Sequence, residues 1–92
     1  MNDKKKWLEK KLAEKVIELK HKEYEYFLSL IDKEPLIFSH GNINNDEFYQ
    51  IEINVFFEDK NKKDILVTLS IDDGGWRAIC PVSTNILISK AE

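Results

Sequence analysis

Residues 48–58, with the sequence FYQIEINVFFE, give the clearest indication of the fold, because apolar and polar side chains alternate along them. An apolar residue stands at every odd position from Tyr49 to Phe57, and polar residues fill most of the even positions. Successive side chains of a strand point to opposite faces, so this pattern predicts a half-buried β-strand. Residues 65–71, ILVTLSI, repeat the alternation after the polar segment 59–64. The two segments are therefore predicted to form an antiparallel pair.

The segment that follows the second strand carries the strongest turn signal in the chain. Asp73-Gly74 is a typical two-residue hairpin loop, because such loops require positive φ angles. A strand over 76–82 is then predicted to return antiparallel, with Ile71 opposite Trp76. A last short strand is predicted over 86–89, and the sheet becomes a meander of neighbouring strands.

The N-terminal part has helical periodicity. Residues 3–33 contain neither Gly nor Pro, and their apolar side chains recur at helical spacing. They predict one long helix that ends before Pro35, with a bend near His21 as the less favoured alternative. A short strand over 36–39 and a loop over 40–47 connect this helix to the central strands.

These segments predict an α+β fold in which a long N-terminal helix packs on an antiparallel meander sheet of four to five strands. The chain has 92 residues, a net charge of −3 and 42% hydrophobic residues, which indicates a single folded domain over residues 1–92. No apolar run is long enough to span a membrane and no signal-peptide pattern is present, so the expected location is cytoplasmic. The helix is expected to cover the face formed by Ile51, Ile53, Val55, Val67, Leu69, Ile71, Ala78 and Cys80.

The opposite sheet face is predicted to mix polar and large apolar residues. A contiguous exposed apolar patch on a monomer commonly marks an interaction site, so a partner protein or a second copy is expected to cover it, unless its apolar residues are scattered or the loop over 40–47 shields them. The apolar residues placed on this face are Phe48, Phe56, Leu66, Ile79 and Leu87.

Catalytic and metal-binding patterns are missing from the sequence. Cys80 is the one nucleophile that His21 or His40 would activate, and it falls on the predicted core face. The adjacent carboxylate pairs lie at predicted turns, where side chains are normally hydrated and lack the desolvation that a catalytic carboxyl group needs. No spacing of His, Cys, Asp or Glu is typical of a metal site. The sequence therefore predicts a protein that is not an enzyme and holds neither a cofactor nor a metal.

The charges are unevenly distributed. Lysines dominate the predicted helix up to Lys22, which makes nucleic-acid binding one alternative function. Carboxylates dominate residues 46–73 and gather at the predicted hairpin ends, where they favour a basic protein partner. The candidate partner-binding residues are Asp46, Glu47, Glu52, Asp72, Asp73, Trp76 and Arg77.

The small acidic chain, with its predicted helix, meander sheet and missing catalytic pattern, resembles the small immunity proteins that neutralise bacterial toxins. Residues 70–78, SIDDGGWRA, also resemble a hairpin found in other small bacterial proteins. The first resemblance implies a non-enzymatic inhibitor that blocks a basic partner such as a toxin or nuclease. A homo-oligomeric structural domain is the other alternative, nucleic acid is the less favoured partner, and no membrane partner is expected.

Overall fold

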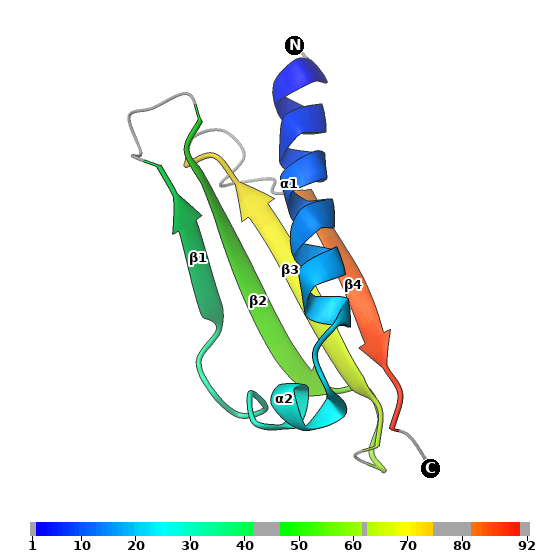
Figure 1. Ribbon diagram of the computed structural model, residues 1–92. Coiled ribbons are helices and arrows are strands. Elements are labelled where there is room, and N and C mark those ends of the chain that lie inside the picture. Colours follow the sequence, from blue (N-terminus) through cyan, green and yellow to red (C-terminus); the bar gives the residue numbers. More distant parts are fainter. Residues whose placement is uncertain (1, 42–46, 62, 75–81, 91–92) are drawn as a thin grey trace.

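The computed structural model describes residues 2–41, 47–61, 63–74 and 82–90, which form two helices and one antiparallel sheet (Figure 1). The strand order in the sheet is the order along the chain, β1-β2-β3-β4. The α+β class and a sheet within the predicted four to five strands are therefore confirmed. The elements are α1 (Asn2–Lys20), α2 (Tyr24–Leu28), β1 (Leu36–His40), β2 (Tyr49–Phe57), β3 (Ile65–Asp72) and β4 (Val82–Ile88).

The two central strands have the register that their alternating sequences require. Ile51 of β2 lies opposite Ile71 of β3, and Ile53 lies opposite Leu69. All four of these side chains are buried, because they point to the face that α1 covers. β3 alternates strictly between buried and half-buried positions along its whole length. Burial of one face fixes the register, since a shift by one residue would expose every apolar side chain.

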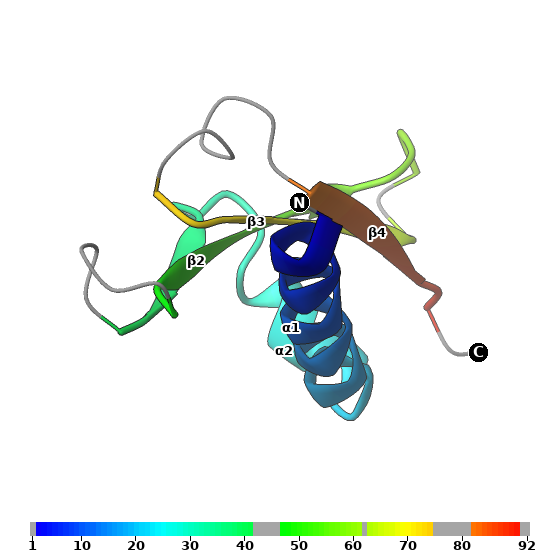
Figure 2. The same ribbon diagram turned by 90° about the horizontal axis from the view of Figure 1, so that it is seen from above.

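Helix α1 packs across β3 and β4 and leaves the other sheet face uncovered by either helix (Figure 2). Its buried residues Leu8, Leu12 and Leu19 recur at helical spacing and point to the sheet. Leu8, Val67 and Ile71 are completely buried at the centre of this layer. The hydrophobic core is therefore a single layer between one helix face and one sheet face.

The predicted unbroken helix over 3–33 is wrong. The helix ends at Lys20, and Glu23, whose backbone is extended, immediately precedes α2. The 19 residues of α1 span about 28 Å, close to the length of β2, so a longer helix would run past the sheet into solvent. The break near His21, which was the less favoured alternative, turns the chain back under the sheet end.

The turn allows α2 to complete the core. Phe27 is 1% exposed, whereas in a straight helix it would lie about 12 Å beyond Leu19. Tyr24 donates a hydrogen bond from Oη to the carbonyl oxygen of Lys63, at 2.6 Å, which ties α2 to the start of β3. Tertiary burial has overridden a locally favourable helical sequence.

The predicted hairpin around Asp73-Gly74 is also wrong. β3 pairs with β4, so that Ile71 lies opposite Val82 and Val67 lies opposite Ile86. The predicted partner of Ile71, Trp76, lies outside the described residues, as do residues 75–81 in general. A strand over 76–82 would have contained Pro81, which has no N–H for the ladder, whereas 82–88 offers an uninterrupted set of donors.

The last strand begins earlier than predicted, because residues 82–88 provide an uninterrupted set of backbone N–H donors. Residues 82–88 form β4, in place of the expected 86–89. Its residues Val82, Ile86 and Ile88 point to the α1 side and replace the predicted core contributions of Ala78 and Cys80, which lie outside the described residues.

Candidate functional site

The sheet face opposite α1, called here the open face, carries a row of apolar side chains across three strands. Phe56 of β2 lies opposite Leu66 of β3, and Leu66 lies opposite Leu87 of β4. Phe56 is 44% exposed and Leu87 is 54% exposed, whereas Leu66 between them is half-buried. Side chains directly opposite each other in antiparallel strands touch, so the three form one continuous patch.

Carboxylates lie on the same face toward the other end of the sheet. Glu52 of β2 is exposed and lies opposite Ser70, and Asp72 lies opposite Gln50. The Nδ2 of Asn54 donates a hydrogen bond to Oε2 of Glu52, at 3.1 Å, which orients this carboxylate along the strand. Oδ1 of Asp72 accepts a hydrogen bond from the backbone N–H of Gly74, at 2.8 Å. Asp72 therefore shapes the end of β3 as well as contributing charge.

The structure brings together part of the predicted contact surface. Glu52 and Asp72 share the open face. Glu47 directly precedes β2 and Asp73 directly follows β3, so both lie just beyond the strands at the same end of the sheet. Acidic side chains and the apolar row thus belong to one sheet face. The other predicted residues, Asp46, Trp76 and Arg77, lie outside the described residues.

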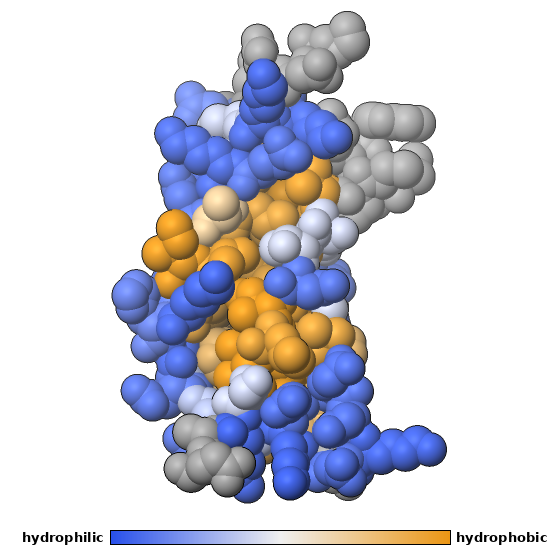
Figure 3. Space-filling model, turned by 90° about the vertical axis from the view of Figure 1, so that its right-hand side faces the viewer, coloured by the Kyte–Doolittle hydropathy of each residue, from blue (hydrophilic) through white to orange (hydrophobic). Residues whose placement is uncertain are grey.

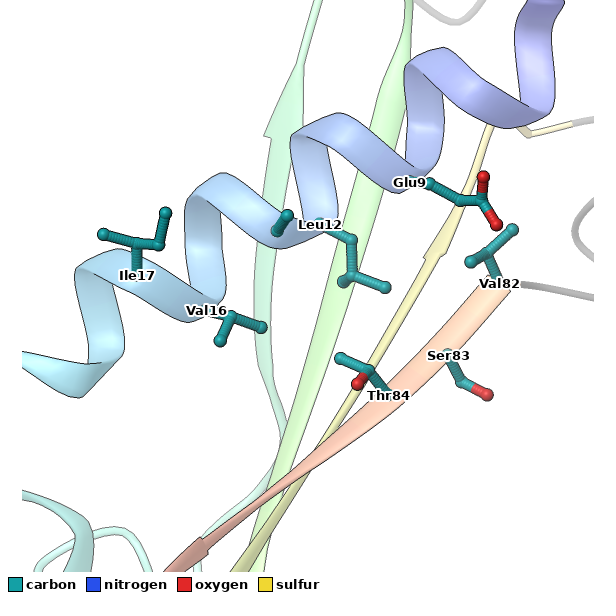
Figure 4. A pocket seen from close by; sticks show the side chains of 8 residues that line it. Glu9, Leu12, Val16, Ile17, Val82, Ser83 and Thr84 are labelled. Atoms are coloured by element: carbon teal, nitrogen blue, oxygen red, sulfur yellow. The ribbon is translucent and has the colours of Figure 1, made fainter.

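A second feature, which the sequence analysis missed, is an apolar groove between α1 and β4. Its volume is about 400 Å³. Figure 3 shows apolar atoms along this side of the molecule, between polar ends. Figure 4 shows Leu12 and Val16 pointing from α1 toward β4, with Glu9 across from Val82. The groove is lined by Glu9, Leu12, Ala13, Val16, Ile17, Val82, Ser83 and Thr84.

One residue gave a signal for this groove. Ile17 lies outside the apolar stripe that packs on the sheet, and it is 60% exposed, the highest value among the exposed large apolar residues. A large apolar side chain beside the buried stripe of a helix widens its apolar surface toward a neighbour. The partner strand β4 was misplaced in the prediction, so the groove could not be foreseen.

Several lysines of α1 are engaged with aromatic rings. The Nζ of Lys4 lies 4.5 Å from the centre of the Trp7 ring, and Nζ of Lys15 lies 4.1 Å from that of Phe38. Lys15 also pairs with Glu18, at 3.2 Å. These contacts each stabilise the helix by a fraction of a kcal/mol to about 1 kcal/mol. Part of the lysine-rich sequence therefore serves the fold itself.

The aromatic residues near the start of α1 form a cluster with the end of β1. The rings of Trp7 and Tyr49 meet edge to face with centres 5.5 Å apart, and His40 stacks on Tyr49 at 5.1 Å. His40 is exposed, and His21 is exposed at the end of α1. Both histidines thus lie at the surface, away from Val67 and the buried layer.

The described part of the chain shows no group of three or more metal-ligating side chains and no buried polar side chain.

The described residues define a two-layer α+β architecture, with one helical layer on a four-stranded antiparallel sheet. No protein family, no curated protein and no solved structure matches this chain. Within the described residues, none of the helices has the length and apolar character needed to cross a membrane.

Proposed function

We propose that this protein is a non-enzymatic protein-binding module and that the open face is its binding site. The observation that carries the proposal is the row Phe56–Leu66–Leu87, which lies exposed on a sheet face that neither helix covers. Exposed apolar patches on folded proteins commonly mark interaction sites, because burying them against a partner is favourable. Aromatic residues at the centre of such patches often supply much of the binding energy.

The charge of the surface supports a basic partner. Glu52 and Asp72 lie on the same open face as the apolar row, toward the other end of the sheet, and Glu47 and Asp73 flank that end. Opposite charges speed association and fix orientation, while the apolar contacts hold the complex. A sheet face with both features suits a partner that has lysines or arginines at one end of an apolar surface.

The more specific form of the proposal is an immunity or inhibitor protein that acts in the cytoplasm. It would cover the active site of a basic toxin or nuclease, whose substrate-binding surface must attract phosphates and is therefore basic. The acidic composition and the resemblance to toxin-immunity proteins support this form. Inhibition would follow from occlusion, without chemistry by the inhibitor.

The experiment compares three forms of the tagged protein as bait in lysate of its native host at about 0.15 M salt: the wild type, Phe56→Ser/Leu87→Ser and Leu28→Ser. Leu28 is the matched control, because it is an exposed leucine on α2, at 42% exposure, away from the open face. A protein retained by the wild type and by the control, and lost from the double variant, is the expected result. Its dissociation constant and its enzymatic activity are then measured with and without the purified inhibitor.

Two results would contradict the proposal. A captured protein that the double variant retains as strongly as the wild type does not bind the open face. Nucleic acid retained by all three baits, and released steeply with rising salt, would favour the alternative prediction of nucleic-acid binding through Lys4–Lys22.

A further inference from the structure

The edge strand β4 lacks the features that prevent edge strands from pairing. In the part of the chain that the structure describes, β4 is hydrogen-bonded to β3 on one side only. Its sequence, VSTNILI, contains no charged residue, no proline and no glycine. Natural edge strands are commonly protected by such residues, because a free row of N–H and C=O groups accepts another strand. The apolar groove runs directly beside this unprotected edge.

We propose that β4 pairs antiparallel with β4 of a second copy of this chain, so that the two sheets become one and the two α1 helices pack together over the junction. The proposal concerns a different surface from the open face, and it holds whether or not the open face binds a partner.

The strand pairs well with itself when Asn85 lies on the two-fold axis. Thr84 then lies opposite the partner's Ile86, and Val82 lies opposite the partner's Ile88. These residues all point to the α1 side in each copy, so both helices lie on the same side of the joined sheet. Because β4 has no charged residue, no like charges oppose each other across the axis.

The outer side of α1 is complementary to itself in the antiparallel direction. Glu9, Ala13, Ile17 and Lys20 recur every three or four residues, so they lie along one side of the helix. When two copies run antiparallel, Glu9 faces the partner's Lys20, and Ala13 faces the partner's Ile17. The small Ala13 allows close approach, and the exposed Ile17 loses contact with water. Each apolar contact and each ion pair occurs twice, as two-fold symmetry requires.

The two registers share one symmetry axis. Glu9 lies across from Val82, and α1 and β4 run in the same direction (Figures 1 and 4). The midpoint between Ala13 and Ile17 lies about 9 Å along the helix from Glu9, at about 1.5 Å per residue. Asn85 lies about 10 Å along the strand from Val82, at about 3.3 Å per residue. The two-fold axis that passes through Asn85 of β4 therefore also passes close to the midpoint between Ala13 and Ile17. The antiparallel contact of the two α1 helices requires the axis at that midpoint.

The separation of the two helices is also suitable. α1 packs over β3 and β4. The helix axis therefore lies about one strand spacing, about 4.8 Å, from the two-fold symmetry axis, which passes just outside β4. The two helices would then be about 10 Å apart, within the range at which helices pack against each other. The grooves of the two copies face each other, and each receives the partner's Ile17.

The expected dimer is of moderate affinity. The surface involves β4 and one side of α1, fewer than the roughly 20–30 residues that each partner of a standard interface contributes. We expect a dissociation constant on the order of micromolar, which corresponds to a modest interface of this type. Sedimentation velocity of the full chain from about 1 µM to about 1 mM therefore covers the transition from monomer to dimer.

Three variants test the geometry. Ile17→Lys places a charge at the centre of the helix contact and is expected to weaken dimerisation at least about 100-fold, because two buried isoleucines are lost. Glu9→Lys is expected to weaken it about tenfold, because it sets two lysines against each other at each end. The double variant Glu9→Lys/Lys20→Glu restores opposite charges and is expected to recover the wild-type constant. Ile37→Lys is the control, since Ile37 is an exposed isoleucine, at 50% exposure, on the opposite edge strand β1.

A strict monomer over the whole concentration range would overturn the proposal. A dimer that Ile37→Lys disrupts and Ile17→Lys does not would also overturn it, because that dimer forms through β1 or through the open face, where Ile37 lies opposite Glu52. Failure of Lys20→Glu to rescue Glu9→Lys would exclude the antiparallel helix register. The Ile17 and Glu9 variants lie on α1, away from the open face, whose partner is tested with the Phe56→Ser/Leu87→Ser variant.

Discussion

Gly41 directly follows β1 and has a φ of +82°, in the region that L side chains rarely adopt. A Cβ at this position would lie 3.4 Å from the Cα of Phe48, which is itself buried. The backbone angle therefore favours glycine, whereas a Cβ would meet its neighbours at about ordinary contact distance. The turn holds the end of β1 at the level where His40 lies opposite Tyr49.

The substitution Gly41→Ala is expected to lower the free energy of unfolding by about 1 kcal/mol, because the left-handed conformation costs a side chain about this amount. Urea denaturation followed by circular dichroism measures the change. Ser39→Ala is the control, since Ser39 is exposed in regular strand backbone and its replacement is expected to change stability by less than about 0.5 kcal/mol. Equal stability of the two variants would contradict this view of the turn.

A second prediction at the level of single residues concerns the phenol of Tyr24. Its hydrogen bond to the carbonyl oxygen of Lys63 connects α2 with the segment before β3. Tyr24→Phe removes the donor and keeps the ring, so the free energy of unfolding is expected to fall by about 0.5–1.5 kcal/mol. An unchanged urea midpoint would mean that water replaces the bond without loss.

Among the secondary-structure elements, the short helix α2 is held to the hydrophobic core by one buried side chain. Phe27 is 1% exposed, and the neighbouring Leu28 is 42% exposed. Phe27→Ala is expected to lower the free energy of unfolding by about 3–5 kcal/mol, because it leaves a cavity at the end of the core. Leu28→Ala, the matched control, is expected to cost less than about 1 kcal/mol. Similar losses for the two variants in thermal or urea unfolding would show that α2 is not held by its buried face.

The strands of the sheet differ in how well the sequence predicts them. β2 and β3 carry their alternation within one short segment each, so their faces and their antiparallel pairing were predicted correctly. β4 takes the place beside β3 that residues 76–82 were predicted to take, and Thr84 and Leu87 interrupt the apolar alternation of β4. Which segment pairs with β3 depends on the total stability of each possible pairing, including the loss of the N–H that Pro81 lacks. Local periodicity does not report this stability.

In the molecule as a whole, the residues proposed to bind a partner lie on the open face, and the residues of the hydrophobic core lie on the other face of the sheet. Phe56 and Leu87 contribute exposed surface, while the core lies on the opposite side of the same strands. The variant Phe56→Ser/Leu87→Ser is therefore expected to keep the free energy of unfolding within about 1 kcal/mol of the wild type while losing the partner. A large loss of stability would show that these residues belong to the core instead of a binding surface.

Charge gives a further prediction for the proposed complex with a basic partner. Glu52→Lys, on the open face, is expected to slow association and to weaken binding about tenfold at low salt, with a smaller difference at high salt. Glu25→Lys makes the same change of charge on the exposed side of α2 and is the control. Equal effects of the two substitutions in a salt series would indicate that only net charge matters and that the open face has no special role.

Sequence patterns were enough to predict the two-layer architecture, the alternation of β2 and β3, and the open-face positions of Glu52, Phe56 and Leu66. These follow from periodicities of about two and 3.6 residues, which are properties of short segments. Asp72 was predicted at a turn and lies at the end of β3, where it still shares the open face.

Three features depend on the packing of the whole chain: the end of α1, the strand that pairs with β3 on the side away from β2, and the position of Ile17 at a groove beside β4. The helix ends where the sheet ends, because burial of Phe27 outweighs continuation of a helix in solvent. The groove joins residues separated by most of the chain, such as Ala13 and Thr84. Contacts of this kind arise from the packing of complete elements, so no local pattern contains them.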